Sequence, residues 1–145
     1  MGRLFLYKRD FRSPTLCCYV IYTVYVIKNS RIIKEEVKTM HIATERGDHY
    51  KLEFKSDKLL LGVAEVAVYN ELAEVVYIGI DRSIMQFDEL QAMVRTIDRF
   101  LSETGASVAY INTDGLADEM IAEFMDRSYI QEWALEPAPL YKMLQ

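Results

Sequence analysis

The chain has 145 residues, with 17 basic and 22 acidic side chains and a formal net charge of −5 at pH 7. That length suits one domain with its own core, so we predict a single domain over residues 1–145. An apolar content of 51% excludes disorder caused by low hydrophobicity. The negative balance supplies no positive field to attract phosphate, so nucleic acid is not expected as a partner.

Cysteine usage and the first residues bear on the compartment. Cys17 and Cys18 are adjacent, so on a strand they point to opposite faces, and we expect two reduced apolar side chains. His41 and His49 have no cysteine or carboxylate pair at metal spacing, and no metal is expected. Residues 1–10 carry no signal peptide, and no apolar run reaches the ~20 residues that span a bilayer. We therefore expect a cytoplasmic protein without a membrane partner.

The first predicted elements are a strand and a helix. Residues 15–27 are rich in β-branched and aromatic side chains, which is typical of a strand covered on both faces. After Ser30, a candidate helix cap, three apolar residues follow at helical spacing: Ile33, Val37 and Met40. This spacing predicts a helix, with a strand as the alternative.

An antiparallel meander is predicted next, with strands over 49–55, 60–69 and 74–81. Gly62 and Gly79 interrupt its second and third strands. A glycine inside a strand usually marks a bulge or a close backbone approach.

The clearest helical periodicity follows. Apolar residues recur in steps of three and four at Phe87, Leu90, Val94, Ile97 and Leu101. They predict one buried helix face, with Ser83 and Gln86 at capping-box spacing before it and Gly105 beyond its end. A strand over 107–112 and a short helix over 120–125 come next. Asp114 is the expected cap of that helix, and strands over 129–133 and 140–143 close the chain.

This order predicts an α+β fold, a mixed α/β sandwich. Its central mixed sheet should contain the antiparallel meander and carry helices on both faces. Because a helix joins the strands 74–81 and 107–112, we expect them to be parallel neighbours that separate near Gly79.

The segment LAEVVYIGIDRS at 72–83 resembles the fourth strand of the GNAT superfamily of N-acetyltransferases. The element order is similar to that superfamily from about residue 15 onward. On this match Glu74 occupies the position of the general base. The resemblance implies acetyl-CoA as the cofactor, bound by backbone groups of the strand at Ile78 and Ile80.

The same resemblance implies three further cofactor contacts. Asn112 ends a strand where many members keep an asparagine beside the cofactor, and Arg82 could supply a charge for its phosphates. Gln86 would begin the phosphate-binding loop, which in the family contains two small residues. Here Glu89 and Gln91 stand in their places.

The residues around the expected base and acid complete the prediction. Strand alternation puts Glu74 on the face of Val76, Ile78 and Ile80, where partial dehydration would raise its pKa. The tyrosine that serves the family as acid aligns with Phe124, which has no hydroxyl.

Two hypotheses therefore stay open. The first is an acyl-CoA-dependent N-acyltransferase acting on a small-molecule or peptide amine, favoured by Glu74. The second is a non-catalytic GNAT-like binding or assembly module that has lost its cofactor, favoured by Glu89 and Gln91. A homodimer stays open as the oligomeric state in either case.

Overall fold

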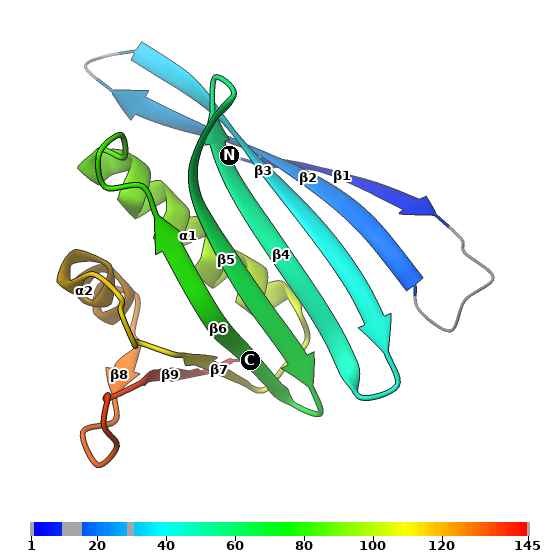
Figure 1. The fold of residues 1–145 in the computed structure, drawn as a ribbon, viewed down its shortest axis with the longest axis vertical. Coiled ribbons are helices and arrows are strands. Elements are labelled where there is room, and N and C mark those ends of the chain that lie inside the picture. The colour runs from blue at the N-terminus through cyan, green and yellow to red at the C-terminus, as the bar shows by residue number, and fades with distance from the viewer. Residues whose placement is uncertain (1, 10–15, 29–30, 145) are drawn as a thin grey trace.

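The protein is described here from a computed structural model. It defines the backbone of residues 2–9, 16–28 and 31–144, and the side chains of residue 23 and residues 36–144. In this part of the chain one mixed sheet of nine strands carries two helices (Figure 1). The predicted α+β fold class is confirmed.

Six antiparallel strands come first: β1 (Gly2–Arg9), β2 (Leu16–Lys28), β3 (Arg31–Thr44), β4 (Gly47–Ser56), β5 (Leu59–Tyr69) and β6 (Leu72–Ile80). They are followed by α1 (Phe87–Glu103), β7 (Val108–Ile111), α2 (Asp118–Asp126), β8 (Ile130–Gln131) and β9 (Leu140–Met143). In space the order is β1-β2-β3-β4-β5-β6-β7-β9-β8. The meander and the parallel β6–β7 pair are confirmed. Strand β1 was not predicted, and the side chains of Cys17 and Cys18 lie outside the described part.

The helix predicted after residue 30 is wrong, because residues 31–44 form β3. This strand pairs with β2 and β4 along most of its length. Burial follows a period of two, since Val37 and Thr39 are buried and Lys38 between them is exposed. Backbone pairing with two long strands satisfies every second donor and acceptor on each side, which outweighs the chance helical spacing. The expected cap, Ser30, lies outside the described residues.

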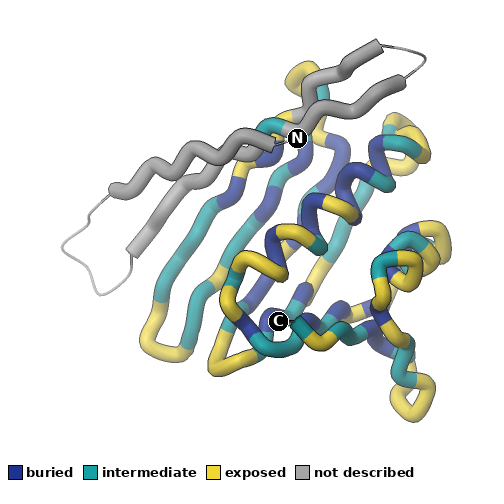
Figure 2. The backbone as a smooth tube through the Cα atoms, turned by 180° about the vertical axis from the view of Figure 1, so that it is seen from behind, coloured by how far each residue is buried: buried dark blue, intermediate teal, exposed yellow. Residues whose placement is uncertain are grey.

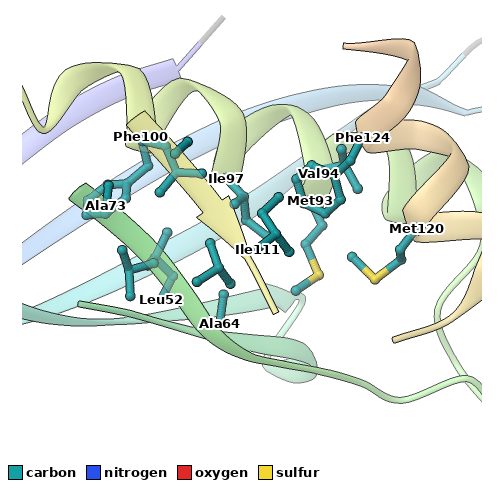
Figure 3. Close-up of a cluster of buried hydrophobic side chains, with 14 of the residues drawn as sticks. Leu52, Ala64, Ala73, Met93, Val94, Ile97, Phe100, Ile111, Met120 and Phe124 are labelled. Atoms are coloured by element: carbon teal, nitrogen blue, oxygen red, sulfur yellow. The ribbon is translucent and has the colours of Figure 1, made fainter. Parts of the chain in front are cut away.

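Both helices pack on the same face of the sheet, which we call the inner face (Figure 2). Helices on both faces were predicted, and that prediction is wrong for the described residues, in which one of the three predicted helices is replaced by β3. Met120 and Phe124 of α2 enter the same buried cluster as Ile97 of α1 (Figure 3). Between the helices, the Gln91 amide donates a hydrogen bond to the Glu123 carboxylate at 3.1 Å.

Both helices predicted in the C-terminal half are confirmed, with corrections at one core residue, one helix cap and one strand. Four residues of the α1 stripe are buried: Leu90, Val94, Ile97 and Leu101. Phe87, the first residue of the stripe, is 59% exposed and does not belong to the core. Helix α2 begins after Ala117, so Asp114 is not its cap. The strand expected over 129–133 is reduced to β8 (Ile130–Gln131).

Candidate functional site

The parallel strands β6 and β7 separate after a short paired stretch. Leu72–Val75 of β6 pairs with Val108–Ile111 of β7, and the pairing ends there. The next residue, Val76, is extra in β6, because the register with β5 shifts at this point. This β-bulge turns β6 away from β7. The predicted separation is therefore confirmed, but it begins at Val76 and not at Gly79.

Asn112 lies at the closed end of the gap between β6 and β7. Its N–H donates a hydrogen bond to the Val75 carbonyl at 3.0 Å, and its side-chain amide donates to the Val76 carbonyl at 3.3 Å. Its side-chain oxygen accepts the Asp114 N–H at 3.0 Å. Asn112 thus stands beside the gap, as the resemblance implied, while its polar groups satisfy the backbone around it.

Beyond the bulge, β5 is the one described strand that pairs with β6. The Asp81 N–H donates to the Leu61 carbonyl of β5 at 2.8 Å. Since successive residues of a strand direct their N–H groups to opposite edges, those of Ile78 and Ile80 face away from β5 and into the gap. Their side chains pack against the core. The backbone positions expected to hold a ligand are therefore presented at an open edge.

A cavity of about 630 Å³ occupies this gap. One wall is residues 77–80 of β6, and the other is the loop 114–118 that leads into α2. A second cavity, of about 270 Å³, adjoins it at the start of α1 and is lined by Gln86 and Glu119. Arg82 lines both.

The N-terminus of α1 is occupied by carboxylates of the chain itself. Gln86 is the N-cap residue, and its N–H donates to the buried Glu89 carboxylate at 2.8 Å. The Glu89 N–H donates to Asp88 at 3.1 Å. The capping pair is therefore Gln86 with Glu89, whereas Ser83, the cap predicted from spacing, binds the Asp81 carboxylate. Two negative charges stand where a helix would otherwise attract a phosphate.

Arg82 pairs with a carboxylate on α2. Its guanidinium lies 3.3 Å from the Glu119 carboxylate, and the two side chains are 66% and 59% exposed. An ion pair with this exposure is weak, so another anion could readily replace Glu119 as the partner of Arg82. Arg82 is therefore beside the cavities, as predicted, with an acidic partner already in contact.

Glu74 lies on the opposite side of the sheet from the one predicted. The bulge at Val76 shifts the alternation, so Ile78 and Ile80 return to the inner face while Glu74 points to the other, which we call the outer face. The predicted apolar row around its carboxylate is therefore wrong. The carboxylate accepts a hydrogen bond from the Tyr69 hydroxyl at 2.9 Å. This bond, together with partial burial and the carboxylate charge, raises the pKa of Tyr69 above its ordinary 10.0.

A third cavity, of about 700 Å³, opens on the outer face. Tyr77 lines both this cavity and the gap, and its ring folds over Gly79, where any side chain would overlap the Tyr77 hydroxyl. Glu65, directly across from Tyr77 on β5, lines the same outer cavity. The sequence analysis predicted neither Tyr77 nor Glu65 as a site residue. The extra residue at Val76 interrupts the alternation of β6, so the face of Tyr77, and with it the pairing to Glu65, could not be assigned.

Phe124, the position aligned with the acid of the family, is fully buried in α2. Its ring packs edge-on against Tyr129, with centroids 5.3 Å apart. Among the residues that the structure describes, Tyr77 instead is the tyrosine that lines the gap.

No family model, curated protein or solved structure matches this chain. Across the described residues, neither helix has the length and apolar character needed to cross a membrane. No group of three or more potential metal-ligating side chains comes together in that same part of the chain.

Proposed function

We propose that this chain is an acyl-CoA-dependent N-acyltransferase of the GNAT type, which moves an acetyl group from acetyl-CoA to the amino group of a small molecule or peptide. The observation that carries the proposal is the gap between β6 and β7. There the backbone groups of Ile78 and Ile80 line a cavity of about 630 Å³ without a neighbouring strand. An extended arm that contains amides can pair with such an edge as an added strand would.

The fit differs between the two halves of coenzyme A. The pantetheine arm is extended and carries amides, which suits the open edge of β6. The nucleotide phosphates would meet Asp88 and Glu89 at the start of α1, and the nearby Arg82 already contacts Glu119. We therefore expect the arm to supply most of the affinity and the phosphates to add little.

The proposed acyl transfer uses the open edge of β6 to bind the donor and Glu74 on the outer face of β6 to accept a proton. When bound, acetyl-CoA supplies an activated thioester carbonyl. In this proposal a backbone N–H of Ile78 or Ile80 donates to the carbonyl oxygen and stabilises the charge that develops on it. The amine nitrogen attacks the carbonyl carbon, the C–S bond breaks, and coenzyme A leaves as a thiolate that takes a proton from water. Glu74 accepts the proton of the attacking amine, directly or through water.

The second candidate is a non-catalytic GNAT-like binding or assembly module. The capping contact of the buried Glu89 carboxylate with the Gln86 N–H favours it, because this contact uses a donor that a phosphate would need. Under this alternative the gap would not bind acetyl-CoA.

Calorimetric titration with acetyl-CoA separates the two candidates. We expect saturable binding by the wild-type protein that disappears in Ala117→Trp, because residue 117 lines the gap and a large ring would fill it. Ala134→Trp is the matched control, since Ala134 is exposed in the loop before β9. Absence of binding at ~1 mM, equivalent to an affinity weaker than about −4.1 kcal/mol, would reject the acyltransferase.

A further inference from the structure

Among the residues that the structure describes, one carboxylate of the outer-face cavity has no partner. Of its four charged side chains, Lys51 contacts Glu53 at 3.8 Å and Arg82 contacts Glu119 at 3.3 Å. Asp81 accepts hydrogen bonds from Ser83. In the described part of the chain, no hydrogen bond or ion pair engages the fourth, Glu65.

Glu65 faces an aromatic ring across the sheet. Its register partner on β6 is Tyr77, which is 54% exposed and stands between the outer cavity and the gap. A carboxylate attracts an alkylammonium ion, and a tyrosine that lines the same cavity can add a cation–π interaction. The leucines at 60 and 61 and Val63 give the same cavity an apolar wall.

We infer that this outer cavity is the acceptor site and that Glu65 and Tyr77 bind the amino group of an amine with an apolar chain. The inference rests on the proposed function, because it supplies the second substrate for the donor in the gap. It also divides the work between two carboxylates. Glu65 holds the amine, and Glu74, which bonds to Tyr69 and lines none of the three cavities, would accept the amine proton through water.

The test measures amine binding without any thioester present. Hexylamine is titrated into the ¹⁵N-labelled protein, with 1-hexanol as the uncharged probe of the same length. We expect hexylamine to shift the amides around Glu65 and Tyr77 and to bind at least about fivefold more tightly than hexanol. Glu65→Gln should remove that preference, while Glu103→Gln, which changes an exposed carboxylate at the end of α1 away from the three cavities, should keep it.

Three results would overturn the acceptor site. They are equal affinities for hexylamine and hexanol, an unchanged preference in Glu65→Gln, or an equal loss in Glu65→Gln and Glu103→Gln. Any of them with acetyl-CoA binding intact contradicts the acceptor site alone. Failure of acetyl-CoA to bind contradicts the proposed function, whatever the amine titration shows.

Discussion

At the residue scale, the contact between Tyr69 and Glu74 makes the free energy of unfolding fall at alkaline pH. Ionising the Tyr69 phenol would place two negative charges next to each other and break the hydrogen bond that the hydroxyl donates at 2.9 Å. The folded state therefore holds the pKa of Tyr69 above its ordinary 10.0. A raised folded-state pKa contributes stability that is complete below pH 10.0 and lost as the pH rises through the raised value.

Urea unfolding between pH 8 and pH 11 checks this contact. We expect the free energy of unfolding of the wild-type protein to fall more steeply above pH 10.0 than that of Glu74→Gln, which has no carboxylate charge. The other tyrosines are common to both proteins and cancel in the comparison. Parallel pH profiles would mean that the Tyr69–Glu74 bond does not persist in solution.

A second residue-scale prediction concerns Arg82 and Glu119. Glu119→Gln removes the carboxylate 3.3 Å from the guanidinium and leaves Arg82 available to a phosphate. Because both side chains are mostly exposed, the free energy of unfolding should change by less than ~1 kcal/mol. The affinity for acetyl-CoA should rise at low salt, while that for acetylpantetheine, which lacks the nucleotide phosphates, should stay constant. Equal changes for both ligands would place Arg82 away from the phosphates.

At the scale of the element, α1 separates a buried stripe from an exposed end. Ile97 is fully buried, so Ile97→Ala should lower the free energy of unfolding by about 2–5 kcal/mol. Phe87 belongs to the same sequence periodicity but is 59% exposed, and Phe87→Ala should cost less than ~0.5 kcal/mol. Denaturant titration measures both values, and similar costs at the two positions would contradict the packing of α1.

The elements also show what sequence patterns can and cannot predict. Strands β4 to β7 were predictable as apolar or alternating runs bounded by turn residues, and α1 was predictable from its apolar stripe. The β6 bulge could not be predicted, because the extra residue, Val76, is an apolar residue within an apolar strand and gives no signal in the sequence. It nevertheless changes the face on which the later side chains of β6 lie. That is why Glu74 was predicted on the same face as Ile78 and Ile80, from which the bulge separates it. Strand β3 was predicted only as the alternative to a helix, because its pairing with β2 and β4 is a long-range property.

At the scale of the whole molecule, both helices of the described residues cover the inner face of the sheet (Figure 2). The proposed donor gap opens between β6 and β7, and the proposed acceptor cavity opens on the outer face. Tyr77 lines both cavities, so the two substrates would meet at this residue. In this arrangement the donor and the acceptor approach β6 from different sides, which allows both to be bound at once.

The most direct test of donor binding at the open edge of β6 follows individual backbone amides while acetyl-CoA is added. In the ¹⁵N-labelled protein, the N–H groups of Ile78 and Ile80 face the gap, whereas those of Tyr77 and Gly79 face β5 by the same alternation. We predict that acetyl-CoA shifts the Ile78 and Ile80 resonances most, and that Ala117→Trp abolishes these shifts. Shifts of equal size at all four residues, or none at millimolar ligand, would contradict donor binding along the open edge of β6.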